Sequence, residues 1–173
     1  INAIGPRNLA IAATTVGAKL VHVSTDYVFA GTERAPRTEF DEPNPISAYG
    51  KTKLEGEHFV RQFAEKFFIL RTAWLYGDGK NFVKTMVRAS KTHDEVSVVC
   101  DQFGSPTSAK DLARIILYLI KTNEYGTYHA TCQGVCNRYE FAQEVLKLAG
   151  KRITLRPVVT SESDLSSARP AYA

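Results

Sequence analysis

The stretch KLVHVSTDYVF, residues 19–29, decides the fold class. It opens with the aliphatic side chains of Leu20, Val21 and Val23 and then passes into a turn. A short β-prone run that is bounded by a turn predicts a strand, and a run with little polar alternation is typical of a strand covered on both faces. We therefore expect helices on either side of it in the sequence.

Helical and β-prone patterns alternate along the rest of the chain. Apolar residues at helical spacing predict helices over residues 1–18, 44–65, 81–91, 108–122 and 138–150. β-prone runs predict strands over residues 66–77, 95–99, 126–132 and 152–160. Gly17 is expected to end the first helix, and Asn44 and Pro45 are expected to cap and begin the second. The alternation predicts an α/β fold with a parallel sheet flanked by helices.

Two segments leave the carboxyl ends of the first two predicted strands. They are STDYVF, residues 24–29, and TAWLYGDG, residues 72–79. Ligands of open parallel sheets bind in the crevice outside the carboxyl ends of the strands. A candidate site should therefore combine side chains from these two segments.

The composition is that of an ordinary globular protein. Of 173 residues, 44% are hydrophobic and 23% are charged, and the net charge of +4 comes from scattered lysines and arginines. This pattern argues against nucleic-acid binding, and no apolar run reaches the roughly 18 residues that would indicate a membrane span. Cys100, Cys132 and Cys136 are odd in number and contain no CxxC pair, so we expect reduced thiols, a cytoplasmic location and no metal site.

The pentapeptide YGKTK, residues 49–53, allows two interpretations. Its centre looks like the end of a phosphate-binding P-loop, which requires the pattern G-x-x-x-x-G-K-S/T. Position 45 would then have to be glycine, but it is Pro45. The second candidate, residues 77–80, fails because Asn81 follows its lysine. The sequence therefore contains no P-loop at either place.

The second interpretation uses the two ends of the pentapeptide, Tyr49 and Lys53. Residues four apart lie on the same face of a helix, and this face continues through Gly56, Val60 and Phe63. A fixed ammonium group near a phenol favours the phenolate and lowers the pKa of the phenol, so that the phenol can exchange a proton near neutral pH. The same spacing also occurs in half-exposed helix pairs without function, and the residues alone leave both options open.

The wider sequence resembles one family. The strings INAIGPRNLA, STDYVF, EFDEPNPISAYGKTKLEGE, LRTAWLYG, DQFGSPTSAKDLA and YEFA occur in the order found in the dTDP-4-dehydrorhamnose reductase family, within the extended short-chain dehydrogenase/reductase superfamily. The resemblance covers nearly the whole chain. It implies an incomplete Rossmann-like sheet with flanking helices in residues 1–80 and a mixed substrate-binding region in residues 81–173. Residues from about 96 to 120 are expected to return to the Rossmann-like part.

The resemblance also implies an activity, namely the reduction of the 4-keto group of dTDP-6-deoxy-L-lyxo-4-hexulose to dTDP-L-rhamnose with NADPH or NADH. Tyr49 would protonate the developing alkoxide, and Lys53 would bind the nicotinamide ribose and lower the pKa of Tyr49. Thr25 would hold the substrate carbonyl in line, and the Val23 backbone would touch the cofactor. Hydride addition builds negative charge on one oxygen, and these groups are of the kind that stabilises such charge.

A further set of residues is implied to bind the substrate: Thr25, Asp26, Trp74, Asn81, Gln102, Gly104 and Pro106. Several of them also have a structural alternative. Asp26 could be a turn residue after its strand, Trp74 could belong to the core, and residues 102–107 could form a plain turn. None of the four histidines shows the arrangement of a catalytic triad, so we assign them no catalytic role.

The sequence also departs from the family pattern. The glycine-rich turn that receives the cofactor pyrophosphate does not occur, so we expect an internal fragment that also lacks the C-terminal end, with doubtful activity alone. Ala30 and Arg138 stand where acidic and aromatic residues are common, which leaves the exact sugar open. Another sugar-nucleotide epimerase or reductase and a non-catalytic regulatory subunit of this fold are the alternatives. We expect a dTDP-linked sugar as partner, no nucleic acid and no membrane, with a homodimer as one option.

Overall fold

The computed structural model describes residues 1–162 and 169–172. Its centre is a parallel sheet of three strands in the order β1-β2-β7, formed by β1 (Leu20–Thr25), β2 (Phe67–Thr72) and β7 (Gly126–His129). The register pairs Thr25 with Thr72, so the strands β1 and β2 end side by side. The predicted α/β fold with a parallel sheet is therefore confirmed.

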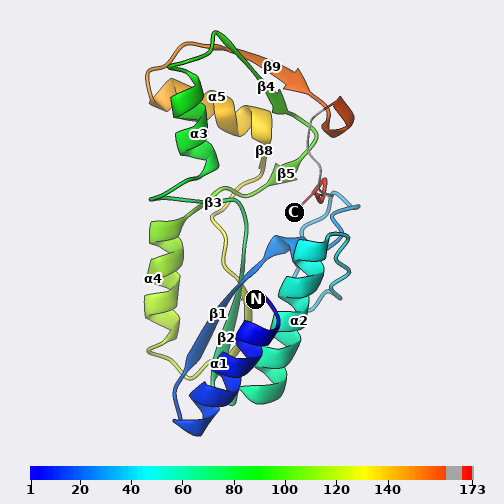
Figure 1. Ribbon diagram of the computed structural model, residues 1–173, viewed down its shortest axis with the longest axis vertical. Helices are drawn as coiled ribbons and strands as arrows, with labels where there is room; N and C mark the ends of the chain where they lie inside the picture. Colours follow the sequence, from blue (N-terminus) through cyan, green and yellow to red (C-terminus); the bar gives the residue numbers. More distant parts are fainter. Residues whose placement is uncertain (163–168, 173) are drawn as a thin grey trace.

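Helices cover both faces of this sheet (Figure 1). Helices α1 (Ile4–Thr15) and α2 (Ala48–Phe63) lie on one face, and α4 (Ala109–Leu119) lies on the other. Strand β2 is buried on both sides because its side chains alternate between the two layers. One core cluster joins α4 to the sheet and contains Phe68, Leu70, Leu112, Leu119 and Ala130. The other joins α1 and α2 to the sheet and contains Ala10, Val60, Ala64 and Ile69.

The start of α2 differs from the prediction. The cap is Ser47, whose Oγ accepts a hydrogen bond from Gly50 N at 3.0 Å, and the helix begins at Ala48 rather than at Pro45. Asn44 has a different structural role. Its Oδ1 accepts a hydrogen bond from Ala30 N at 2.9 Å and so connects the two ends of the loop between β1 and α2. Both residues suit an N-cap chemically, and tertiary contacts decide between them.

Gly56 allows a close approach between α2 and the start of α1. A Cβ atom at this position would lie 2.3 Å from Asn2 O and 3.3 Å from Pro6 Cγ, so a side chain there would clash with the first turn of α1. Gly17 ends α1 as predicted, with a φ of 68° that glycine adopts without strain. These two glycines fix how α1 and α2 pack together.

The second part of the fold is a separate ribbon of two parallel strands, β4 (Glu95–Val99) and β9 (Thr154–Val158). Helices α3 (Phe82–Ala89) and α5 (Arg138–Leu148) pack on it, at the top of Figure 1. The core of this unit contains Met86, Val98, Ala142, Val145 and Leu146. The sequence predicted both strands but not that they form a sheet of their own.

Four two-residue strands connect the two parts. Strand β3 (Leu75–Tyr76) pairs with β6 (Thr107–Ser108), and β5 (Phe103–Gly104) pairs with β8 (Cys136–Asn137). The predicted strand over residues 66–77 is therefore wrong in its second half, because the chain turns between β2 and β3. Such short strands have no periodicity that a sequence could reveal.

Three global observations complete the fold. Cys100, Cys132 and Cys136 are free thiols. In residues 1–162 and 169–172, no helix is both long and apolar enough to cross a membrane. In the same part of the chain, no three His, Cys, Asp or Glu side chains converge as the ligands of a metal ion would.

Candidate active site

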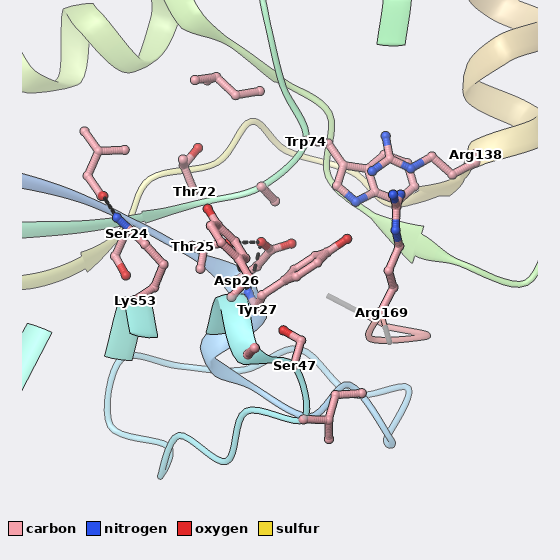
Figure 2. Close-up of a pocket in the computed structure, with 16 residues that line it drawn as sticks. Ser24, Thr25, Asp26, Tyr27, Ser47, Lys53, Thr72, Trp74, Arg138 and Arg169 are labelled. Carbon is pink, nitrogen blue, oxygen red and sulfur yellow. Dashed lines mark hydrogen bonds between the residues drawn. The ribbon is translucent and has the colours of Figure 1, made fainter. Parts of the chain in front are cut away.

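A cleft of about 830 Å³ lies beyond the carboxyl ends of β1 and β2 (Figure 2). It brings together six of the predicted site residues: Val23, Thr25, Asp26, Tyr49, Lys53 and Trp74. Its other lining residues include Ser24, Tyr27, Ser47, Thr72, Arg138 and Arg169. The two segments that the sequence singled out, residues 24–29 and 72–79, thus meet at one cleft, which also receives the first turns of α2.

The first turn of α2 presents Tyr49 to the cleft. Gly50 allows this because a Cβ atom at its position would lie 2.2 Å from Tyr27 O, so only glycine lets the helix approach the end of β1 this closely. The ring of Tyr49 packs edge-on against Tyr27 with their centroids 5.9 Å apart. Tyr49 is 49% exposed, which leaves it accessible to a ligand in the cleft.

Lys53 reaches from the second turn of α2 to the neighbouring strand. Its Nζ donates a hydrogen bond to Val23 O at 2.6 Å. Burial lowers the pKa of Lys53 from its ordinary value, although the negative charge of Glu57 opposes this shift. The lysine is thus held at the carboxyl end of β1, one helical turn from Tyr49.

Glu57 is a buried residue that the sequence interpretation missed. Its carboxylate is fully buried and accepts hydrogen bonds from Ser24 Oγ at 2.5 Å and from Arg71 Nη2 at 2.8 Å. Arg61 Nη2 donates a further bond at 2.9 Å. Burial raises the pKa of Glu57, but the bonds from Arg71 and Ser24 outweigh it, so the pKa lies below its usual range. A charged residue within the apolar run FFILRT was the available signal, because a buried arginine needs a partner.

Thr25 and Asp26 form a local hydrogen-bonded unit at the end of β1 (Figure 2). Thr25 Oγ1 donates to Asp26 Oδ1 at 2.8 Å, and both oxygens accept from Tyr27 N. Burial raises the pKa of Asp26 to about 6, against the opposing effect of the bonds from Thr25 and Tyr27. Asp26 is therefore both a turn residue and a wall of the cleft.

Trp74 and Arg138 form the far wall of the cleft (Figure 2). Trp74 follows the end of β2 and has a φ of 42°, a left-handed conformation that is uncommon for a bulky side chain. Its side chain lines the cleft. The guanidinium carbon of Arg138 lies 3.6 Å from the centroid of a Trp74 ring. Burial lowers the pKa of Arg138 from its ordinary value. The sequence noted Arg138 only as a departure from the family pattern, and its place in the cleft could not be read from it.

The other predicted substrate residues lie outside this cleft. Gln102 lines a second cleft of about 940 Å³ that shares Trp74 and Arg138 with the first, and its Nε2 donates to Thr160 Oγ1 at 3.1 Å. Gly104 packs under the indole, since a Cβ atom there would lie 2.6 Å from Trp74 Cε2. Pro106 follows in the connection between β5 and β6 and lines neither cleft.

Asn81 is occupied by the local backbone. Its Oδ1 accepts a hydrogen bond from Lys84 N at 3.1 Å and thereby caps α3. Its Nδ2 donates to Gly77 O at 2.7 Å and to Gly79 O at 3.2 Å. The structure thus gives Asn81 a capping role and does not bring it to the first cleft.

Comparisons with known proteins agree with one another. Residues 1–173 match the family described as RmlD substrate binding domain. The spore coat polysaccharide biosynthesis protein SpsK of Bacillus subtilis is 42% identical, over 99% of this chain and 61% of that protein. The dTDP-4-dehydrorhamnose reductase of Escherichia coli is 41% identical, over 87% of this chain and 52% of that protein.

Solved structures give the same result. A dTDP-4-dehydrorhamnose reductase from Clostridium acetobutylicum shares 57% identity with a TM-score of 0.97, over 99% of this chain and 61% of that one. The Bacillus anthracis enzyme in complex with NADP shares 50% identity with a TM-score of 0.97, over 99% of this chain and 62% of that one. This chain therefore spans about half to three fifths of the length of these relatives. It has the Rossmann-like α/β fold of such reductases and belongs to the RmlD substrate binding domain family.

Proposed function

We propose that this chain carries the proton-donating side of an NAD(P)H-dependent reductase, which reduces the 4-keto group of dTDP-6-deoxy-L-lyxo-4-hexulose to dTDP-L-rhamnose. The observation that carries the proposal is the single cleft in which Thr25, Tyr49 and Lys53 lie together at the carboxyl ends of parallel strands. The names of the Escherichia coli and Clostridium acetobutylicum relatives support the substrate, and the NADP complex of the Bacillus anthracis relative supports the cofactor.

The chain offers groups that fit the nicotinamide half of such a cofactor. Lys53 Nζ uses one hydrogen bond, to Val23 O, among the bonds found in residues 1–162 and 169–172, so two of its three hydrogens can reach ribose hydroxyls. Val23 is 38% exposed at the mouth of the cleft and can pack against a planar ring. When bound, the cofactor supplies the hydride for the carbonyl carbon of the substrate.

Tyr49 and Lys53 then act as a pair. Negative charge develops on the carbonyl oxygen during reduction, and the accessible hydroxyl of Tyr49 can transfer its proton to that oxygen. The phenolate that remains is stabilised by the ammonium group of Lys53, which the Val23 carbonyl holds one helical turn away. The fixed position of this charge means that little reorganisation accompanies the reaction.

Thr25 supplies the second hydrogen bond to the carbonyl. Its hydroxyl hydrogen is directed at Asp26 Oδ1, and a hydroxyl can rotate between two acceptors without moving its oxygen. Asp26 thus keeps the Thr25 oxygen in place until a carbonyl arrives. Trp74 and Arg138 provide an aromatic and a cationic surface for the remainder of the substrate.

The decisive experiment follows NADPH absorbance with the full-length protein and the dTDP-linked keto sugar. Tyr49→Phe should lower kcat by about 10²–10⁴-fold, the usual contribution of a positioned acid. Lys53→Ala should also lower kcat, whereas Lys51→Ala should not, because Lys51 is exposed and lies outside the lining of the cleft.

Three results would contradict the proposal in whole or in part. Unchanged turnover in Tyr49→Phe would mean that another group supplies the proton. Tight cofactor binding without turnover by the wild-type protein would favour a non-catalytic binding subunit. Turnover of a different dTDP-sugar alone would keep the mechanism but change the substrate.

We also propose a division of the chain, with residues 1–80 in a cofactor domain and residues 81–173 in a substrate-binding region, from which part of 96–120, namely α4, and also β7 return to the central sheet. The packing of Leu112 and Leu119 of α4 on the sheet supports this return of the chain. The free thiols suit a reducing compartment, and we place the reaction in the cytoplasm.

A further inference from the structure

A small inner cavity of about 180 Å³ lies behind the active-site cleft. Asp26 and Ala73 line both spaces and form the partition between them. Arg71 and His129 line the inner space as well, and the further polar side chains of its wall are Arg37, Ser105, Thr131 and Tyr172. The ring of Phe29 packs against both, 5.1 Å from the Arg71 guanidinium carbon and 5.7 Å from the His129 ring centroid.

Three buried side-chain polar atoms of residues that line this cavity have no hydrogen-bond partner in the described part of the chain. They are Asp26 Oδ2, Arg71 Nη1 and His129 Nε2. Arg71 itself is only 3% exposed, and its Nε and Nη2 are already bound to Glu57. Buried polar groups nearly always have partners, and an unsatisfied one costs about 1–3 kcal/mol, so three around one cavity indicate a ligand.

We propose that this inner cavity is a hydration site, in which ordered water bridges Arg71 Nη1, His129 Nε2 and Asp26 Oδ2 and thereby positions Asp26 and the Thr25 hydroxyl. The effect on catalysis rests on the function proposed above. The binding of water does not, because it follows from the cavity and its wall alone.

The balance of donors and acceptors selects water over an ion. Arg71 Nη1 carries only hydrogens, while Asp26 Oδ2 is an acceptor. Burial lowers the pKa of His129 from its ordinary value, so its ring is neutral near pH 7 and Nε2 can accept. One water can receive from Arg71 and donate to the other two. An anion would face the Asp26 oxygen, and a cation would face the guanidinium group of Arg71 in a cavity that Arg37 also lines.

The volume agrees with this assignment. A cavity of about 180 Å³ could take several waters at roughly 30 Å³ each, and a buried water typically makes about three hydrogen bonds. Three unpaired atoms therefore satisfy one bridging water completely, and further waters can connect it to the open side of the cavity.

The position of Asp26 in the partition links the hydration site to the cleft. Its Oδ1 faces Thr25 Oγ1 and Tyr27 N, while Oδ2 is the atom without a partner. A water held by Arg71 and His129 restrains Oδ2 and stops the carboxylate from turning. Thr25 then keeps its oxygen at the place where a carbonyl would be bound. His129 is in this sense a positioning residue and not a catalytic one.

The first test is a high-resolution crystal structure of the full-length protein. We expect density for a water within hydrogen-bonding distance of Arg71 Nη1 and Asp26 Oδ2, with His129 Nε2 as its third partner. A direct ion pair between Arg71 and Asp26, or a side chain that fills the cavity, would overturn the hydration site. This readout is independent of any enzyme activity.

The second test compares two substitutions of one residue. His129→Leu removes the acceptor and should lower kcat about tenfold, which corresponds to one hydrogen bond of about 1.4 kcal/mol, with the KM for NADPH unchanged. His129→Gln offers an amide near the place of Nε2 and should restore most of kcat. His58→Leu, at an exposed position of α2, controls for the loss of a histidine as such.

The two variants must be folded for this comparison, which thermal unfolding can establish. Equal losses of kcat in His129→Leu and His129→Gln would overturn the positioning role even if the water is present. If the wild-type protein does not oxidise NADPH at all, the proposed function fails, whereas the crystallographic test of the water still decides the binding site.

Discussion

The three-stranded sheet and the β4–β9 unit use similar elements but bury different chemistry. The sheet and its helices bury polar side chains, among them Ser24, Thr25, Glu57, Arg71 and Thr72. In the β4–β9 unit with α3 and α5, the buried side chains of the described chain are all apolar: Met86, Val98, Ala142, Val145 and Leu146. One unit contains a buried charge network, and the other is an ordinary hydrophobic core.

The difference shows in which part of the fold charged side chains are buried. Removing a charge from water costs several kcal/mol unless it is paired and hydrogen-bonded. Here Glu57, which is paired with Arg71, lies one helical turn after Lys53 on α2 and binds Ser24, the residue before Thr25 at the end of β1. The β4–β9 unit needs no such network, because its contribution to the first cleft is one side chain at the start of α5, Arg138.

The largest effect should follow from breaking the charge network. Glu57→Ala leaves Arg71 and Ser24 without their buried acceptor, and we expect a loss of about 3–5 kcal/mol in the free energy of unfolding. Urea unfolding of the full-length protein measures this. Glu55→Ala is the matched control, because Glu55 lies on the same helix but is half-exposed and should change stability by less than about 0.5 kcal/mol. Similar losses in both variants would mean that the network contributes nothing.

The apolar unit should respond by a different mechanism. Leu146→Ala creates a cavity between α5 and the β4–β9 ribbon, and we expect a loss of about 2–4 kcal/mol that does not vary with pH. Turnover per folded molecule should stay unchanged, because Leu146 does not line the first cleft. Leu148→Ala, at a residue 79% exposed, is the control. A loss of kcat in Leu146→Ala would show that the two units are not independent.

The same contrast explains what the sequence could predict. Helix α5 begins at Arg138 as expected, because the signals are local: Asn137 caps the helix and Glu140 completes a capping box. Strand β4 coincides with its β-prone run, Glu95–Val99. Local propensity and periodicity therefore sufficed for most elements of both units.

The charge network and the connections were not predictable in this way. Glu57 and Arg71 lie 14 residues apart on different elements, so no helical or strand period links them. The choice of Ser47 over Asn44 as helix cap depends on a contact between Asn44 and Ala30. For the candidate site, the resemblance to one family predicted the residues of the cleft. It also predicted Asn81 as a substrate residue, and nothing in the sequence showed that Asn81 caps α3 instead.

The smallest expected effect concerns Asp26, and it tests whether a charge that is buried in the wall of the cleft lowers the stability of the protein. Burial raises the pKa of Asp26 from 3.8 to about 6, so the folded state binds this proton more tightly than the unfolded state. The resulting stabilisation is complete below about pH 3.8 and is lost as the pH rises through 6. At pH 7.5 the buried carboxylate of Asp26 is ionised, and burying this charge lowers the stability of the folded protein. The neutral amide of Asn carries no such charge. The free energy of unfolding of Asp26→Asn, taken relative to that of wild type, should therefore rise by about 1–2 kcal/mol from about pH 4 to pH 7.5.

Asp41 gives a control of opposite sign for this prediction. Hydrogen bonds from Thr38 N and Oγ1 lower the pKa of this exposed carboxyl, so its contribution is present at neutral pH and is lost as the pH falls. Asp41→Asn should therefore lose stability at pH 7.5, while Asp26→Asn gains it. Urea unfolding at the two pH values measures both. If Asp26→Asn also loses stability at pH 7.5, the hydrogen bonds of the ionised Asp26 outweigh its burial, as they do for Glu57, and the two carboxylates no longer differ in this respect.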